Sequence, residues 1–278
     1  MLTRKRVLPL VAAAVVVLTV ALLTWSQADG RRPAPAAPQS SWQSSSPAPT
    51  PSQAPTGAAT ALWTPPGIVA TTAVDELQVF DAPDGRVVHS LSPWSAVSHP
   101  RTLLALQEQV VGDATWFHVL VPVQPNQTTG WIRAEDVSVT RTTASVHIFV
   151  AERELELWDG EELILTAPVA VGTDQTPTPP GVYSVTDPLD STHNDTGVYG
   201  AYALGLSGFS EVLETFNGAP PQLAIHGTNE PALIGQSVSN GCIRLHNEDV
   251  LALVEHVALG TPVIIHASRD DLTVGIRD

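Results

Sequence analysis

The feature that most constrains the fold is a long apolar run near the start of the chain. No charged residue lies between Val7 and Trp25, and a basic cluster at residues 4–6 precedes this run. A helix needs roughly 20 apolar residues to cross a bilayer, and basic residues before it favour an N-terminus held inside. We therefore predict a membrane helix in residues 1–30, with the rest of the chain on the outer side of the membrane.

A cleaved signal peptide is the alternative, because Ser26 and Ala28 offer small residues to a peptidase. The apolar part of a signal peptide is usually about 7–15 residues long. The run in this chain is longer, which favours an uncleaved anchor. Both interpretations export the protein, either membrane-anchored or secreted.

Residues 31–64 are rich in Pro, Ala, Ser and Gln and have no apolar periodicity. Such a composition buries too little apolar surface to offset the entropy of ordering, so we expect a disordered linker. Its prolines favour extended conformations of about 3.1 Å per residue, so the segment could reach on the order of 100 Å. We interpret it as a spacer that lifts the folded part off a membrane.

The net charge of −15 and the pI of about 4.8 argue against nucleic-acid binding, which usually needs a basic surface. No basic run follows residues 4–6. The acidity is typical of a solvated surface that keeps an exported protein soluble. We expect a monomer that needs no cofactor.

Residues 65–141 show a pattern of short strands. The Asp84-Gly85 turn lies between apolar runs around Val79 and Val88, which is a strong hairpin signal. Two further apolar stretches follow at residues 116–121 and 130–132. Five or so strands in such a short segment predict a small β-barrel.

The tryptophans of this segment add a family resemblance. A strand that contains Trp116, followed by the Gly-Trp-Ile strand of Trp131, resembles the end of bacterial SH3-like domains. The resemblance implies binding of cell-wall peptides or sugars. Trp94, Trp116 and Trp131 could line a groove, although a core position for the last two is the favoured interpretation.

A second domain is expected over residues 144–267, with a tail at 268–278. Apolar residues alternate on both sides of Asp159-Gly160, which indicates two strands and a tight turn. Residues 247–259 have a helical apolar pattern with Asn247 as the cap, and residues 261–267 form a final strand. The pattern predicts a mainly β domain with one or two helices.

Cys242 is the only cysteine in the chain, so it cannot form an internal disulfide. A lone thiol in an exported protein is either reactive or a small buried hydrophobe. A thiol becomes a strong nucleophile as the thiolate, and a histidine can accept its proton. His226 is the natural candidate, because it ends an apolar run and begins a glycine-rich turn.

The residues around the thiol suit acyl transfer. Gly241 can adopt positive φ, so the N–H groups of Asn240, Gly241 and Cys242 could converge on an oxyanion. One such donor can contribute about 3–4 kcal/mol to the transition state. Ser239 could bond the histidine or fix the turn. Arg244 lies on the same side as the thiol in an extended chain, where it could bind a substrate carboxylate or pair with Glu248 or Asp249.

The HGT at residues 226–228 and the SNGCIRL at residues 239–245 resemble the signature of L,D-transpeptidases with a YkuD-type catalytic domain. The resemblance implies a mixed β-sandwich with the active site under a lid. It further implies a peptidoglycan stem tetrapeptide as substrate, Cys242 as nucleophile and His226 as base and then acid. Many members have His where this chain has Asn240, so the base role falls to His226.

The resemblance also implies that the Gly227 carbonyl or Ser239 orients the histidine ring, and that Tyr202 contributes to the substrate groove. The expected product is a 3→3 cross-link. Three alternatives stay open: an L,D-carboxypeptidase, a non-catalytic cell-wall-binding protein, and a metal site at His226, Cys242 and His246, for which the spacing is a weak signal. We expect no metal.

Overall fold

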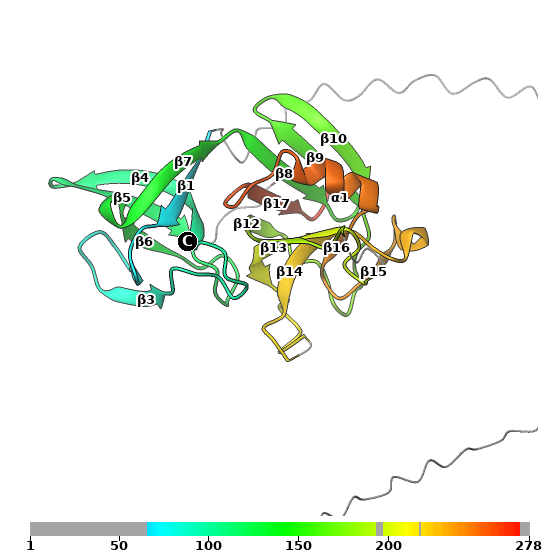
Figure 1. The fold of residues 1–278 in the computed structure, drawn as a ribbon, viewed down its shortest axis with the longest axis horizontal. Coiled ribbons are helices and arrows are strands. Elements are labelled where there is room, and N and C mark those ends of the chain that lie inside the picture. Colours follow the sequence, from blue (N-terminus) through cyan, green and yellow to red (C-terminus); the bar gives the residue numbers. More distant parts are fainter. Residues whose placement is uncertain (1–65, 193–196, 217, 273–278) are drawn as a thin grey trace, which may run out of the picture. The chain divides into compact units, whose positions relative to one another are not determined.

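The computed structural model describes residues 66–192, 197–216 and 218–272 (Figure 1). The predicted membrane helix and the predicted linker lie outside the described residues. Within the described part, no helix has the length and apolar character that a membrane crossing requires. The described chain is built mainly from strands, which confirms the mainly β class.

The N-terminal described segment is one antiparallel sheet of seven strands, in the order β3-β2-β6-β5-β4-β1-β7. The strands are β1 (Gly67–Thr72), β2 (Leu77–Phe80), β3 (Val87–Leu91), β4 (Thr102–Val111), β5 (Ala114–Leu120), β6 (Thr129–Arg133) and β7 (Val137–Thr142), with a 3-10 turn at Ala134–Asp136 before β7. The sequence predicted fewer strands, because β1, β4 and β7 carry weaker turn signals at their ends. The SH3-like assignment stays a prediction.

The hairpin around Asp84-Gly85 forms as predicted, with β2 and β3 antiparallel and Leu77 opposite Leu91. Leu77 and Val79 are fully buried, as expected for the inward positions of a strand with period two. The three tryptophans differ: Trp116 is buried, Trp131 is half-buried and stacks on His118, and Trp94 is 55% exposed.

The second segment is an eight-stranded sheet, in the order β10-β9-β8-β17-β12-β13-β14-β16, together with a separate two-stranded pair of β11 and β15. Its strands are β8 (Ala144–Phe149), β9 (Glu154–Asp159), β10 (Glu162–Pro168), β11 (Val171–Gly172), β12 (Gly181–Asp190), β13 (Tyr202–Phe209), β14 (Gln222–His226), β15 (Ser237–Ser239), β16 (Ile243–Arg244) and β17 (Pro262–His266). A 3-10 turn covers Pro231–Leu233 and one α-helix, α1, covers Asn247–Val254.

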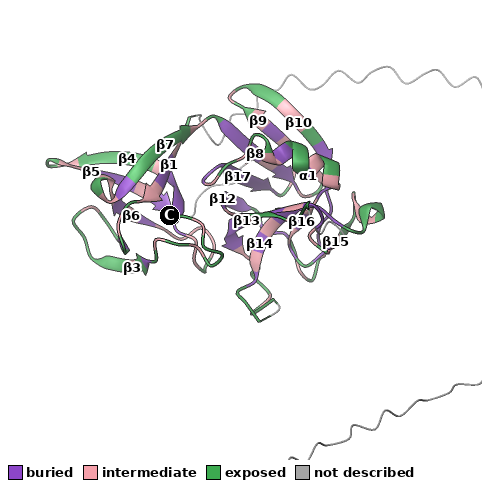
Figure 2. Cartoon of the chain, in the orientation of Figure 1, coloured by how far each residue is buried: buried purple, intermediate pink, exposed green. Residues whose placement is uncertain are grey.

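The burial of these strands follows their place in the sheet (Figure 2). β17 lies between β8 and β12, and all five of its residues are buried. A strand covered on both faces reads as a continuous apolar run, which is why residues 262–265 lack alternation. β10 is the edge strand and is mostly exposed or half-buried, whereas its neighbour β9 alternates; Gly160 joins the two with a φ of 60°.

The helix differs from its prediction in two respects. It ends at Val254, not at residue 259. The capping position belongs to His246, and the side chain of Asn247 points elsewhere: its Oδ1 accepts hydrogen bonds from the N–H groups of Ala201 and Thr228. Asn247 therefore braces two loops and is not a helix cap.

Candidate active site

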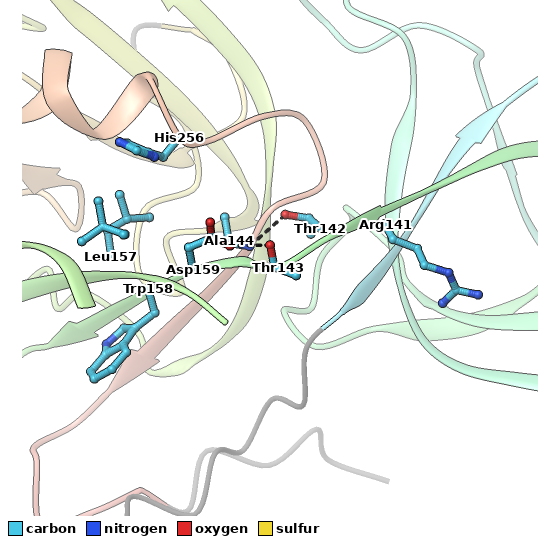
Figure 3. A pocket seen from close by; sticks show the side chains of 9 residues that line it. Arg141, Thr142, Thr143, Ala144, Leu157, Trp158, Asp159 and His256 are labelled. Atoms are coloured by element: carbon cyan, nitrogen blue, oxygen red, sulfur yellow. Dashed lines mark hydrogen bonds between the residues drawn. The ribbon is translucent and has the colours of Figure 1, made fainter. Parts of the chain in front are cut away.

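Two hollows were compared as candidate sites. The smaller one, of about 210 Å³, lies beside the start of β8 and the end of β9. Figure 3 shows its lining, which includes Thr142, Thr143 and Asp159 and contains no thiol. The larger one, of about 550 Å³, contains Cys242 and His226. We refer to this larger hollow as the groove.

Strand pairing brings Cys242 and His226 together. β14 runs parallel to β16, with Ile225 opposite Ile243 and His226 opposite Arg244. Because side chains alternate along a strand, His226 and Arg244 project from one face while Ile225 and Ile243 project into the core, where both are fully buried. Cys242, two residues before Arg244, joins the face that carries His226.

The floor of the groove is made of small residues. Ala203 lies opposite His226, and Gly205 lies opposite Ala224 on the neighbouring strands β13 and β14. All three small residues line the groove. The sequence does not reveal their role, because alternating small residues in a strand give no chemical signal. They leave room above the sheet for a ligand to approach the thiol.

The His226 ring is held in one tautomer. Its Nδ1 lies 2.6 Å from the carbonyl oxygen of Gly227, and a carbonyl oxygen only accepts, so Nδ1 carries the proton. Nε2 therefore keeps its lone pair and can act as a base. Burial lowers the pKa of His226 to about 4; the Gly227 bond opposes this shift, and the charge of Arg244 adds to it.

The Cys242 thiol is also kept neutral. Burial raises its pKa, although a backbone hydrogen bond at Ala224 and the charge of Arg244 act in the opposite direction. A protonated thiol beside a neutral imidazole is not a preformed ion pair.

Ser239 fixes the turn that carries the thiol. Its hydroxyl accepts from the Gly241 N–H at 3.1 Å and donates to the Cys242 carbonyl at 2.5 Å. The hydrogen bonds of Ser239 therefore fix the turn, whereas the carbonyl of Gly227 orients the histidine ring. The φ of Gly241 is 112°, which requires glycine.

The same bonds narrow the choice of oxyanion donors. The Gly241 N–H is occupied by Ser239. The N–H groups of Asn240 and Cys242 are then the remaining candidates for binding an oxyanion.

Two threonines support this turn from the other side. Thr178 is buried; its hydroxyl donates to the Gly241 carbonyl at 2.8 Å and accepts from the Gly172 N–H at 2.9 Å. The Thr176 hydroxyl donates to the Ser239 carbonyl at 2.9 Å. The proline-rich sequence of residues 176–180 gives no signal of this support.

Asn247 supports the histidine in a similar manner. Its Oδ1 accepts from Thr228 at 3.0 Å and from Ala201 at 3.1 Å. A Cβ at Gly227 would lie 2.2 Å from that oxygen, and one at Gly200 would lie 2.1 Å from it. These two glycines therefore permit the close approach of both loops to Asn247.

Two predicted contacts differ in the structure. Arg244 pairs with Glu230, with Nη1 and Oε2 3.5 Å apart, and not with Glu248 or Asp249. Tyr202 packs against the buried core and does not line the groove, whereas Tyr199 does line it. The Tyr199 ring meets the His226 ring edge-on, with centroids 5.0 Å apart. Sequence spacing alone could not rank the two tyrosines.

The described residues contain no ligand set for the alternative of a metal site at His226, Cys242 and His246. No group of three or more His, Cys, Asp or Glu side chains there is placed to hold a metal ion. His246 precedes α1 as its N-terminal flanking residue.

A half-buried thiol and a neutral imidazole that line the same groove are groups that cysteine-dependent acyl transfer uses. The comparison with protein families assigns the segment more closely. Residues 143–265 match the family model YkuD, the L,D-transpeptidase catalytic domain. The match confirms the resemblance seen in the sequence, and the rest of the chain lies outside it.

Two curated relatives are similar to part of this chain. A Bacillus licheniformis protein named L,D-transpeptidase YkuD is 41% identical over 113 residues, which are 41% of this chain and 59% of that protein. Its Bacillus subtilis namesake is 36% identical over 121 residues, covering 44% of this chain and 65% of that protein. This chain therefore spans about three fifths of the length of these relatives.

Among solved structures, an L,D-transpeptidase from Mycobacterium tuberculosis aligns with a TM-score of 0.38 and 17% identity. The alignment covers 55% of this chain and 90% of that chain. A similarity this distant does not bear on the function of the present protein.

Proposed function

We propose that this protein is a peptidoglycan L,D-transpeptidase that forms 3→3 cross-links through a thioester on Cys242. The observation that supports the proposal best is the placement of Cys242 and His226 in one groove of a YkuD-type domain. The groove offers a nucleophile, a base with a free lone pair and a cation in Arg244. It therefore holds the groups that acyl transfer needs.

The first half-reaction forms the acyl-enzyme. His226 Nε2 takes the thiol proton as the sulfur of Cys242 attacks the carbonyl carbon of the third stem residue. The N–H groups of Asn240 and Cys242 receive the developing oxyanion, which is the kind of contact that stabilises acyl-transfer transition states. The C–N bond then breaks, His226 returns the proton to the departing nitrogen, and D-alanine leaves.

The second half-reaction forms the cross-link. The side-chain amine of a diamino acid in a neighbouring stem attacks the thioester carbon, and His226 accepts a proton from that amine. A new C–N bond forms, the C–S bond breaks, and His226 returns the proton to the sulfur. If water replaces the amine, the same intermediate gives an L,D-carboxypeptidase, so acceptor access separates the two activities.

The location of the protein completes the proposal. The apolar run at residues 7–25 would anchor the chain in the membrane, and residues 31–64 would hold the catalytic domain in the cell-wall space. The seven-stranded sheet would then bind wall peptides or sugars.

The test is a product analysis of the purified full chain with a disaccharide-tetrapeptide, followed by mass spectrometry. We expect a dimer that lacks one D-alanine, and no such dimer with Cys242→Ala. Free tripeptide without dimer would indicate a carboxypeptidase. An unreacted substrate would favour a wall-binding role for the protein.

A further inference from the structure

The contact between Arg244 and Glu230 raises the question of what the arginine binds. Arg244 lines the groove and its side chain is 22% exposed. Its Nε atom is buried and has no hydrogen-bond partner among the described residues. Leaving a buried donor unpaired is unfavourable. An acceptor supplied by a ligand would remove that penalty.

Glu230 is a weak partner for this arginine. The distance of 3.5 Å between Nη1 and Oε2 exceeds the ~2.7–2.9 Å of a charge-assisted hydrogen bond. The Glu230 side chain is 61% exposed, and exposed pairs of this kind contribute little. Its backbone, in contrast, is fixed, because its N–H donates to the Thr228 hydroxyl and its carbonyl accepts from Leu233. Glu230 therefore holds a negative charge near Arg244 but leaves hydrogen-bond donors of the guanidinium free for a ligand.

The substrate of the proposed function carries a carboxylate at the corresponding place. The terminal carboxylate of the departing residue is separated from the attacked carbon by one nitrogen and one Cα, so it lies within about 4 Å of that carbon. Arg244 follows Cys242 by two residues on the same face, a Cα separation of roughly 7 Å along a strand. A long arginine side chain spans that interval readily.

We propose that Arg244 binds the terminal carboxylate of the departing amino acid. In the absence of substrate, Glu230 is the counter-ion of Arg244. The inference rests on the proposed function and explains which stem peptide the enzyme would accept as acyl donor. A stem that ends one residue beyond the scissile bond presents a carboxylate to Arg244. A stem that is one residue longer presents a neutral amide at that place. The Arg244–Glu230 pair therefore selects tetrapeptide donors.

Glu230 and the substrate carboxylate compete for one cation. Removing the charge of Glu230 strengthens the positive field that an acidic donor meets, whereas a neutral donor gains nothing. After the amino acid departs, Glu230 is again the only anion paired with Arg244 among the described residues. The pair thereby favours release of the leaving group.

The experiment compares two donors, a tetrapeptide acid and its C-terminal amide, with the full chain and a saturating acceptor amine. The readout is the ratio of kcat/KM for acid over amide. We expect a ratio of about 10–100 for the wild type, as for a charge-assisted contact of about 1.5–3 kcal/mol. Arg244→Gln should bring the ratio close to one. Glu230→Gln should raise it about threefold, while Glu248→Gln, an exposed charge change on α1, should leave it unchanged.

Each contrary result has a distinct meaning. A wild-type ratio near one, with normal turnover, would overturn this inference and leave the transpeptidase proposal standing. An unchanged ratio in Glu230→Gln would show that Glu230 does not take part in selecting the donor. No release from either donor by the wild type would overturn the transpeptidase proposal and this inference together. Urea unfolding of each variant, compared with that of the wild type, checks that the variants are folded.

Discussion

The imidazole of His226 is tied to its neighbour Gly227 by a hydrogen bond of 2.6 Å between Nδ1 and the carbonyl oxygen. The bond joins residues adjacent in sequence, so it persists as long as the turn at residues 226–228 keeps its shape. It fixes the proton on Nδ1 without a carboxylate partner. The imidazole is consequently oriented by a backbone carbonyl. Side chains that hold this backbone, such as Asn247, therefore also affect the orientation of the base.

The neutral state of the thiol predicts how its reactivity depends on pH. Because burial raises the pKa of Cys242 and lowers that of His226 to about 4, iodoacetamide alkylation should accelerate about tenfold per pH unit through pH 6–8 without a plateau. Mass spectrometry of timed samples measures the rate. A plateau that begins near pH 5 would instead indicate a thiolate–imidazolium pair in the free protein.

A second prediction concerns stability. Burial lowers the pKa values of His226 and His147 to about 4, and the ordinary value of about 6.5 applies in the unfolded chain. Between pH 4 and 6.5 the unfolded chain binds more protons, so the free energy of unfolding should rise with pH by about 1.4 kcal/mol per unit for each histidine and level off above.

Urea titrations at pH 4.5 and 7 measure this effect. His147→Gln should reduce the difference, because it removes one lowered pKa; His147 lies outside the groove, next to His266, whose pKa burial also lowers. Equal pH dependence in the variant and the wild type would contradict this assignment.

The brace formed by Asn247 gives a third prediction. Asn247→Ala removes the acceptor shared by Thr228 and Ala201, which should cost about 1–3 kcal/mol of stability and lower kcat for D-alanine release about tenfold. Asn247→Asp keeps an acceptor oxygen and should retain most of the activity. Equal losses of activity in both variants would show that the two hydrogen bonds do not position His226.

The turn before the thiol gives a fourth prediction. Gly241 has a φ of 112° and Gly235 one of 84°, and only Gly241 adjoins the thiol. Each Ala substitution should cost on the order of 1–3 kcal/mol of stability through backbone strain. Only Gly241→Ala should also slow alkylation of Cys242, because it displaces the turn that Ser239 and Thr178 hold. Thermal unfolding together with the alkylation assay separates the two effects.

Much of the fold could be predicted from local patterns. The Asp84-Gly85 hairpin, the turn at Asp159-Gly160 and the final strand at 262–266 were all predicted, because turn residues and apolar runs act over a few positions. The end of α1 was missed. Residues 255–259 continue the apolar pattern of the helix, and a pattern alone does not tell where a helix stops.

The sequence could identify the candidate site residues whose chemistry depends on the residue type alone. Cys242, His226 and Arg244 all line the groove, as the sequence suggested. Glu230, Thr178 and Asn247 were missed as partners, because their roles depend on loops that meet only in the folded chain. Asn247 has two plausible functions in the sequence, and the fold uses the one that no periodicity reveals. For the same reason Tyr199 could not be preferred to Tyr202.

The parallel pairing of β14 with β16 has a consequence for how this domain tolerates change. The separation of His226 and Cys242 is set by the opposition of Ile225 and Ile243 in that pair, together with the turn that Ser239 holds. The exposed turn around Ala232 is therefore a place where residues can be inserted or exchanged while base and nucleophile stay in register. A designed loop could be grafted there to change which amines reach the proposed thioester.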